Sequence, residues 1–395
     1  MTLPLHGITV LSLEHAVAAP FATRQLADLG ARVIKVERPG TGDFARQYDD
    51  SVNGSSSYFV WLNRSKESIA LDVKSERGHQ VLHELADKAD VIVQNLGPGA
   101  AARLGLSAEE IRDRDPGKIV VSVTGWGSTG PWADRKAYDL LVQCETGLVS
   151  LTGTPDEVAK VGVSIADIAA GMYAFSGILA ALYRRQATGE GATIEVSLFE
   201  ALAEWVGQPA HFTAGAGRQP GRFGAQHATI APYGPFEAGD SHTVLIAIQN
   251  EPEWSRFCTV VLQRPEVAED PRFASSPLRV AHRDEVNALI SEAFAALVTE
   301  ELEARLTAAR IAFAGVNTVS EFLEHPVLEA RDRWRTVETE NGPTRALLPP
   351  IDLGTEARMG PVPALGDHTA AILAELGHDA REFAVAAPSH HESRS

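Results

Sequence analysis

A single acidic side chain, Asp167, lies within a long apolar stretch of the chain, residues 161–182. The next acid along the chain is Glu190, and small or apolar residues flank Asp167 on both sides. Apolar residues recur there at three- and four-residue spacing, at Ile168, Met172, Phe175, Ile178, Leu179 and Leu182. The spacing predicts a mostly buried helix with Asp167 near its start.

Two influences act on the pKa of a carboxyl group in that position. Burial raises the pKa, whereas the N–H groups and the dipole of the first helical turn favour the anion. Asp167 is therefore a candidate for acid–base or nucleophilic chemistry. The competing interpretation is an N-terminal helix cap, a position that Asp also favours. This stretch alone leaves both open.

Composition restricts the class of protein and its partners. The 395 residues are 44% hydrophobic and 22% charged, which is typical of a globular enzyme. The formal net charge of −17 argues against nucleic acid or an anionic membrane as a partner, and a phosphorylated ligand would need a local cluster of Lys and Arg. Cys144 and Cys258 lack the spacing of a metal site or a disulfide framework. The start lacks a signal peptide and no uninterrupted apolar run is long enough for a bilayer, so we expect a cytoplasmic protein.

Strand-like and helix-like segments alternate through the first half of the chain. Residues 7–13 predict a buried strand, 18–30 a helix that ends at Gly30, and 31–38 a second strand, which together form a βαβ unit. Further strands are expected at 69–73, 90–96 and 118–124, followed by a strand and helix over 191–207. The alternation predicts an α/β fold with a Rossmann-like parallel sheet.

Two features of this half resemble a dinucleotide site without forming one. Gly125, Gly127 and Gly130 spell G-x-G-x-x-G after a strand, but Pro131 and a polar segment follow where a helix should begin. Glu37 stands where a nicotinamide-binding domain keeps its ribose-binding acid, yet the first turn has no glycine fingerprint. We therefore expect a glycine-rich loop over another ligand and no dinucleotide.

The second half predicts a change of architecture. Residues 207–224 are rich in Gly, Pro and His and form an expected linker, and 225–330 predict a smaller α/β domain. Residues 331–378 are expected to complete the large domain of residues 1–206, and 379–395 to form a flexible tail.

Seven segments together resemble class III coenzyme A transferases, the CaiB/BaiF family that includes formyl-CoA and carnitine-CoA transferases. The resemblance runs from about residue 4 to 377 in PLHGITVLSLEHAVAAPF, LADLGARVIKVERPGTGD, NRSKESIALDVK, ADVIVQNLGPGAAARLGL, GWGSTGPW, AYDLLVQCETGL and GVSIADIAAGMYAFSGILAAL. It implies that Asp167 is the nucleophile, which would form a mixed anhydride and then an aspartyl-CoA thioester. It further implies that coenzyme A is a co-substrate and that the reaction uses no metal or redox cofactor. Coenzyme A would contact the NRSKES and LDVK segments and Val17, Arg38, Leu71, Lys74, Asn95, Leu96, Gly97, Arg103, Lys136 and Tyr138.

The resemblance also implies an interlaced homodimer of open rings, acyl-CoA and carboxylic acid substrates, and a small dicarboxylic donor such as succinyl-CoA. Without it, the favoured interpretation of the basic residues is that of solvated surface cations: Arg38, Arg64, Lys66, Arg103 and Lys136.

The chain departs from the family pattern at two places. Val17 replaces the usual glutamine, so a contact there would use its backbone. No run of glycines covers the aspartate, and residues 224–227 could take that place.

Two alternative functions remain. An α-methylacyl-CoA racemase needs two bases, but Tyr138, with an ordinary pKa of about 10, stands where racemases have a histidine. A non-catalytic CoA-binding protein would keep the fold without turnover.

Overall fold

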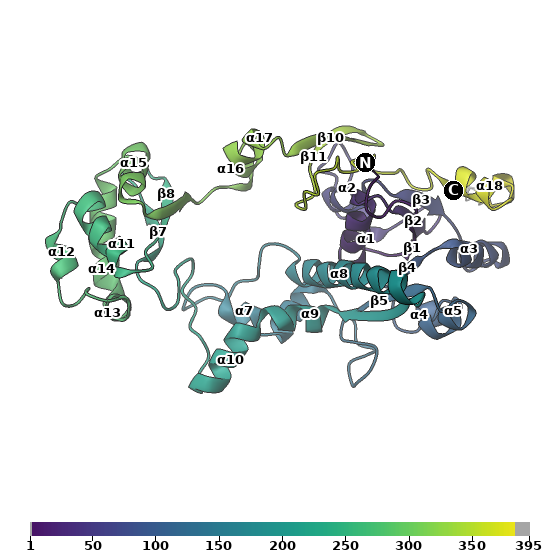
Figure 1. The fold of residues 1–395 in the computed structure, drawn as a ribbon, viewed down its shortest axis with the longest axis horizontal. Helices are drawn as coiled ribbons and strands as arrows, with labels where there is room; N and C mark the ends of the chain where they lie inside the picture. Colours follow the sequence, from purple (N-terminus) through teal and green to yellow (C-terminus); the bar gives the residue numbers. More distant parts are fainter. Residues whose placement is uncertain (1, 384–395) are drawn as a thin grey trace, which may run out of the picture. The chain divides into compact units, whose positions relative to one another are not determined.

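The computed structural model describes residues 2–383, and their backbone divides into two compact units. Unit 1 contains residues 2–146, 161–207 and 330–383, and unit 2 contains 147–160 and 208–329. The chain therefore enters unit 2 first through the short segment 147–160, which the sequence pattern had assigned to the large domain. Figure 1 shows the ribbon with its elements labelled.

Unit 1 is built on a six-stranded sheet with the order β3-β2-β1-β4-β5-β6. Every neighbouring pair of strands in it is parallel. The strands are β1 (Thr9–Leu13), β2 (Arg32–Glu37), β3 (Glu67–Ala70), β4 (Val91–Gln94), β5 (Ile119–Thr124) and β6 (Ala192–Ser197). This confirms the predicted α/β fold with a parallel sheet, and the order is that of a Rossmann-like fold.

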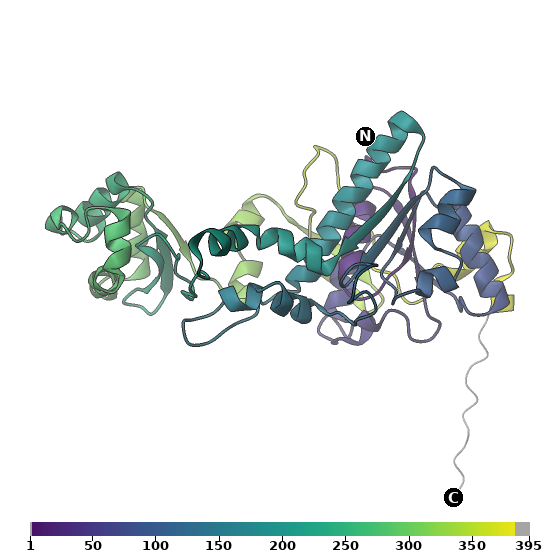
Figure 2. The same cartoon turned by 90° about the horizontal axis from the view of Figure 1, so that it is seen from below.

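Helices cover both faces of this sheet. On one face lies a core of buried Leu, Ile and Val from the strands and from helices α3 (Glu76–Lys88), α5 (Ala108–Arg114) and α18 (Thr369–Glu375). On the other, α8 (Ile165–Thr188) packs against α1 (Ala18–Asp28), β5, β6 and α9 (Leu198–Trp205). Figure 2 shows the long α8 beside the strands. The helices α2 (Ser57–Asn63), α4 (Ala100–Arg103) and α6 (Asp139–Glu145) are shorter.

Helix α8 is the central helix of this second layer. Its length and hydropathy would suit a membrane-crossing helix, although the sequence pattern showed no uninterrupted apolar run of that length. Half of its most apolar window is buried within the protein, as in the core helix of a globular domain. Its small residues allow close packing, since a Cβ on Gly171 would lie 2.6 Å from the carbonyl oxygen of Ala18 in α1.

The C-terminal segment returns to unit 1 and covers an edge of the sheet. A hairpin that the sequence pattern did not predict, β10 (Trp334–Thr339) with β11 (Gly342–Leu347), precedes it. The Ser65 N–H then donates to the Pro361 carbonyl at 2.8 Å, and the His368 N–H donates to the Ser68 carbonyl at 2.9 Å. These bonds occupy backbone groups next to and within β3, which would otherwise be an open edge.

Unit 2 has a core of its own. Its antiparallel sheet, in the order β7-β8-β9, consists of β7 (Tyr233–Glu237), β8 (Thr243–Ala247) and β9 (Ala312–Gly315). Buried Phe, Leu, Ile and Val join it to helices α11 (Glu251–Arg256), α14 (Arg283–Ala295) and α15 (Thr299–Ala309) and to the π-helical turn η2 (Phe257–Val261).

Part of the expected linker is regular structure. Helix α10 (Gly207–Ala216) occupies its first ten residues, where the sequence pattern indicated neither helix nor strand. After α10 the chain is held within unit 2, because the Gly224 N–H donates to the Gly153 carbonyl at 2.8 Å and Arg222 donates to the Thr154 carbonyl at 2.7 Å.

The expected C-terminal tail falls mostly outside the described residues. Within them, Ala380–Phe383 forms a 3-10 turn, η3, and the Phe383 ring packs edge-on against His378.

The contact between α1 and α8 gives a test with a matched control on one helix. We expect Gly171→Ala to lower the free energy of unfolding by about 1–3 kcal/mol, because the new methyl group collides with the backbone of α1. Gly177→Ala meets only Ile194, at 3.4 Å, and should be neutral or stabilising by up to about 1 kcal/mol, because alanine favours helices. Urea unfolding measures both, and equal effects would show that the α1–α8 contact does not limit residue size.

Candidate active site

The order of the strands brings the predicted site residues to one edge of the sheet. Strand β1 lies between β2 and β4, so the order in which the strands are added changes direction at β1. Ligands of such folds bind at the carboxyl ends of the strands at this switch point. Val17 follows β1, Arg38 follows β2, and Leu71 and Lys74 follow β3. The remaining predicted residues follow β4 and β5, namely Asn95, Leu96, Gly97, Arg103, Lys136 and Tyr138.

The loop after β1 is held by two side chains from neighbouring strand ends. Asn95 accepts from the His15 N–H at 2.9 Å and donates to the His15 carbonyl at 2.8 Å. Asp43 accepts from the N–H of Ala16, whose φ of 61° is rare for a residue with a side chain. Asn95 therefore anchors the loop, and the buried Val17 that follows has little side chain to offer a ligand.

Beneath this loop lies a cluster of fully buried charges. Lys66 donates to the Glu14 carboxylate at 2.7 Å, and Lys35 donates to the Asp43 carboxylate at 2.8 Å. Burial alone would raise the pKa of Glu14, but the charges of Lys66 and Lys35 outweigh it and hold that pKa below its ordinary value. Burial lowers the pKa of Lys66 to about 8, against the opposing charge of Glu14. Burial would likewise raise the pKa of Asp43, but the charge of Lys35 and its hydrogen bonds hold it below the ordinary value, so Glu14 and Asp43 both stay ionised at neutral pH.

Arg64 and Lys66 are neither solvated cations nor free to bind phosphate. Arg64 makes two hydrogen bonds of 2.8 Å to Asp28, and Lys66 is occupied by Glu14. Both sequence-based interpretations of these two residues, a surface position and a place along the coenzyme A site, are therefore wrong for their side chains. Glu37 is likewise structural, because it is buried and binds Arg46 and Ser68.

The other cations at this edge remain available. Arg38, Lys74, Arg103 and Lys136 are exposed, and none has an ion-pair partner among residues 2–383. In a chain with a net charge of −17, four unpaired cations on neighbouring loops concentrate positive potential at the edge of the sheet.

Asp167 lies in the first turn of α8, as predicted, and is half-buried. Its carboxylate receives no hydrogen bond from the part of the chain that the structure describes, and burial, with the nearby charge of Asp139, raises its pKa to about 7. The cap of α8 is supplied by Asp139, which accepts from the N–H of Ala166 at 2.7 Å and of Asp167 at 3.4 Å. The capping interpretation of Asp167 is therefore wrong.

Four aromatic rings that the sequence interpretation missed lie at the same edge. The His15 ring stacks on Phe44 with centroids 5.1 Å apart, Phe44 contacts Tyr48, and Tyr48 meets Tyr58 edge-on. Burial raises the pKa of Tyr48 to about 12, with further contributions from the charges of Asp43 and Asp167. Tyr48 therefore lies within electrostatic range of Asp167. Its segment, residues 39–57, has no periodicity that could have marked it.

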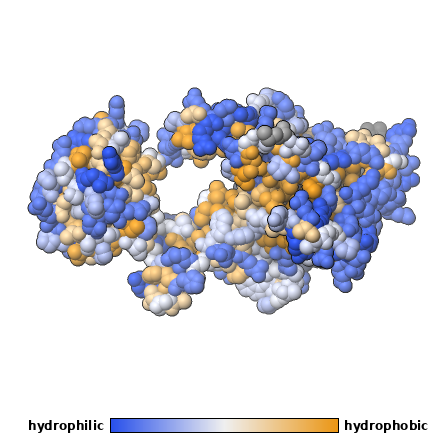
Figure 3. Space-filling view, in the orientation of Figure 1, coloured by the Kyte–Doolittle hydropathy of each residue, from blue (hydrophilic) through white to orange (hydrophobic). Residues whose placement is uncertain are grey.

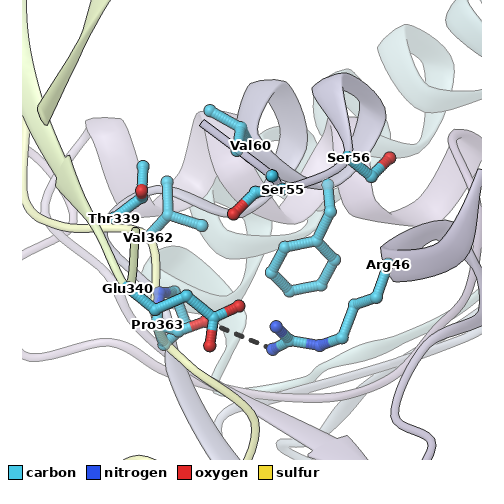
Figure 4. Close-up of a pocket in the computed structure, with 10 residues that line it drawn as sticks. Arg46, Ser55, Ser56, Val60, Thr339, Glu340, Val362 and Pro363 are labelled. Atoms are coloured by element: carbon cyan, nitrogen blue, oxygen red, sulfur yellow. Dashed lines mark hydrogen bonds between the residues drawn. The ribbon is translucent and has the colours of Figure 1, made fainter. Parts of the chain in front are cut away.

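The 3-10 turn that carries Phe44, η1 (Phe44–Gln47), is fixed from behind. The Arg46 guanidinium lies 3.6 Å from the centroid of the Phe59 ring and donates to Glu37 and to the Pro363 carbonyl. Figure 4 shows Arg46 in a small pocket beside Ser55, Ser56 and the C-terminal segment. Because Glu37 already neutralises the charge of Arg46, we interpret the contacts that Arg46 makes in this pocket as structural support for η1.

No helix follows the third glycine of the G-x-G-x-x-G segment, which confirms that it is not a dinucleotide fingerprint. A Cβ on Gly125 would lie 2.1 Å from that of Ala137, and the Trp126 indole N–H donates to the Lys136 carbonyl at 3.3 Å. The loop therefore closes on itself and sets the positions of Lys136 and Tyr138. Among residues 2–383, no group of three His, Cys, Asp or Glu side chains could hold a metal ion.

Comparisons with known proteins agree across nearly the whole chain. The model of CoA-transferase family III matches residues 5–369. The chain is 35% identical over 384 residues to the succinate–glutarate CoA-transferase of Agrobacterium fabrum, covering 94% of this chain and 96% of the relative. It is 39% identical over 292 residues to the acetyl-CoA:oxalate CoA-transferase of Acetobacter aceti, covering 73% and 75%. The crystal structure of a CaiB/BaiF family protein from Brucella suis superposes with a TM-score of 0.86 at 34% identity, covering 95% and 100%.

The raised pKa of Asp167 predicts a pH-dependent gain in stability for Asp167→Asn. In the folded protein Asp167 holds its proton up to about pH 7, whereas in the unfolded chain it releases the proton near the ordinary value of 3.8. Ionisation of Asp167 therefore lowers the stability of the folded protein as the pH rises between these values, and the loss is complete above pH 7. Asparagine avoids this cost. We expect the variant to melt higher than the wild type at pH 8, with a smaller difference at pH 5.

Thermal unfolding at the two pH values measures this effect. Asp50→Asn, which removes an exposed carboxylate, is the control and should change neither melting temperature. A lower melting temperature of Asp167→Asn at both pH values would instead indicate a structural role for the carboxylate.

Proposed function

The chain belongs to CoA-transferase family III, and on that basis we propose that it moves coenzyme A from an acyl-CoA thioester to a free carboxylate through covalent intermediates on Asp167. The observation that carries the proposal is the state of Asp167. Its carboxylate is half-buried, has no hydrogen-bond donor among the described residues and lies at the first turn of α8. Such a carboxylate is poorly solvated and therefore a better nucleophile than one in water.

The reaction needs two exchanges at one carboxyl group. An Asp167 oxygen attacks the thioester carbonyl, the C–S bond breaks, and coenzyme A leaves as a thiolate from a mixed anhydride. The thiolate then attacks the aspartyl carbonyl and releases the donor acid, which leaves an aspartyl-CoA thioester. The acceptor carboxylate attacks that thioester to form a second anhydride, and the thiolate attacks its acyl carbonyl, which regenerates Asp167. No proton, metal or redox partner is consumed.

We propose that the phosphates of coenzyme A meet the exposed cations at the sheet edge. Arg38, Arg103 and Lys136 have free charge there, whereas Arg64 and Lys66 do not. Leu71, Lys74, Asn95, Leu96, Gly97, Tyr138 and the backbone of Val17 would contribute through the loops that they occupy.

The names of the relatives suggest the class of acid. Relatives at 35% and 39% identity are named for succinate with glutarate and for acetyl-CoA with oxalate, and a third, at 30%, for succinyl-CoA with mesaconate. Each of these names contains at least one dicarboxylic acid, free or as its CoA thioester. We propose that this chain likewise uses small dicarboxylic acids, with succinyl-CoA as a donor.

We further propose that two copies form an interlaced homodimer. Unit 1 carries large exposed apolar side chains, and Figure 3 shows apolar residues on the visible face around α1 and α8. The exposed side chains of unit 1 include Trp61, Leu140, Leu141, Tyr183 and Trp205. Interlaced chains cannot exchange without unfolding, so recovery of mixed dimers from native tagged and untagged protein within hours would contradict this arrangement.

Replacement of Asp167 tests the covalent mechanism. Asp167→Asn keeps the size of the side chain but cannot attack, so transfer should fall by several orders of magnitude. The wild type, given succinyl-CoA without an acceptor, should carry a hydroxylamine-sensitive adduct on the peptide that contains Asp167. Coenzyme A binding should survive in Asp167→Asn and weaken in Arg103→Ala. Transfer by Asp167→Asn at nearly the wild-type rate would exclude the mechanism.

A substrate panel in deuterated water tests the acid class and the racemase alternative together. Short mono- and dicarboxylic CoA donors, including a 2-methylacyl-CoA, would each be offered with free acids and read by mass spectrometry. We expect the dicarboxylic donors to transfer coenzyme A, and the 2-methylacyl group to gain no deuterium, because Tyr138 is an exposed phenol and a poor base. Failure of every dicarboxylic donor, or rapid deuterium uptake, would overturn the corresponding part of the proposal.

A further inference from the structure

Helix α8 does not cap its own N-terminus. Ser164, at the capping position, makes no side-chain hydrogen bond to the helix. Asp139, the first residue of α6, supplies the cap instead by accepting from the N–H groups of Ala166 and Asp167 at 2.7 and 3.4 Å. The nucleophile proposed above thus shares its helix terminus with a second carboxylate from another helix.

Asp139 is itself held firmly in this position. Gln143, one turn further along α6, donates to its second oxygen at 2.6 Å. The carbonyl oxygen of the same amide accepts from the Val161 N–H at 3.0 Å, and Gln143 is fully buried. The carboxylate of Asp139 cannot turn away from α8 without breaking these bonds.

We infer that Asp139 is a positioning residue of the proposed reaction, which holds the backbone of Asp167 and favours the states in which the Asp167 carboxyl group carries no charge. The inference rests on the function proposed above. Asp139 already accepts hydrogen bonds from N–H groups at the start of α8, and its charge offsets the positive end of the helix dipole there. The N–H groups and the dipole therefore stabilise the Asp167 anion only a little. Two carboxylates at one helix terminus repel each other when both are ionised.

Acylation removes this repulsion in the same way as protonation does. In the mixed anhydride and in the aspartyl-CoA thioester, the Asp167 carboxyl group is uncharged, whereas in the free enzyme above neutral pH it is an anion. Asp139 therefore raises the free energy of the free nucleophile relative to both covalent intermediates. The direction agrees with the raised pKa of Asp167.

Other charged groups around α8 do not replace Asp139 in this role. Helix α1 has no acid in the turn that faces α8, and its Arg24 and Asp28 pair with each other. On β6 and α9, Glu195 and Glu200 bind serine hydroxyls, and α9 also carries Glu204. From the loops, Tyr48 faces the same region, and its pKa is raised to about 12, so it is uncharged at pH 7. Tyr138 precedes the first residue of α6 and adds no carboxylate.

The experiment compares Asp139→Asn with the wild type by two independent measurements. In the first, succinyl-CoA is added without an acceptor, and the fraction of Asp167 carrying a covalent adduct is measured by mass spectrometry. We expect the adduct to fall about tenfold for each unit by which the pKa of Asp167 falls, because both reactions discharge the same carboxylate.

The second measurement needs no substrate. The gain in melting temperature on Asp167→Asn, compared between pH 8 and pH 5, reports how far the pKa of Asp167 is raised. This pH-dependent gain should shrink in the Asp139→Asn background. Asp139→Ser, which keeps a capping oxygen without the charge, should behave in the same way and serves if the asparagine variant does not fold.

Asp240→Asn is the matched control. Asp240 also caps a helix from another segment, accepting from the N–H and hydroxyl of Thr299 at the start of α15 in unit 2. This variant should lower stability slightly and leave both measurements on Asp167 unchanged. An unchanged pH-dependent gain in Asp139→Asn overturns the inference. A reduced gain with no adduct even in the wild type supports the effect of Asp139 on the charge of Asp167 and counts against the covalent function.

Discussion

The buried pairing of Glu14, Lys35, Lys66 and Asp43 is the constraint on which the candidate site depends. Glu14 directly follows β1, Lys35 lies within β2 and Lys66 directly precedes β3, whereas Asp43 lies in the turn after β2. Their exposed fractions lie between 0% and 3%. Removal of one member of such a buried ion pair typically costs about 3–5 kcal/mol, because its partner is left as an uncompensated charge. The pairing therefore restricts where the loops after β1 and β2 can lie, and with them Val17, Phe44 and Tyr48.

A second constraint brings Asp167 to this edge. Gly171 and the alanines of α8 allow its backbone to approach the start of α1, and Asp167 lies one turn before Gly171 on the same side of the helix. Asp139 then ties that first turn to α6. Packing and capping, rather than a bond to its own carboxylate, thus position Asp167.

The charged residues of this region divide into two groups with different roles. The buried group is paired internally and cannot reach a ligand, whereas Arg38, Lys74, Arg103 and Lys136 are exposed and unpaired among the described residues. This division suits the proposed function, in which the exposed cations meet the phosphates of coenzyme A and the poorly solvated Asp167 carboxylate attacks the thioester. An acidic protein can bind such a substrate because the positive charge is local.

The sequence by itself determined the alternating α/β fold, the place of Asp167 in the first turn of a helix and the family, because periodicity and short motifs are local properties. The sequence predicted a Rossmann-like parallel sheet, but the strand order that gathers the loops came from the tertiary structure. Only the tertiary structure decided that Arg64 and Lys66 are buried, that Asp139 caps α8 and that residues 147–160 belong to unit 2. The reason is distance along the chain: Lys66 meets Glu14 across 52 residues, and Asp139 meets Ala166 across 27. A cation that pairs with a distant carboxylate has the same local sequence as one in water, so burial and partnership appear only when the chain is folded.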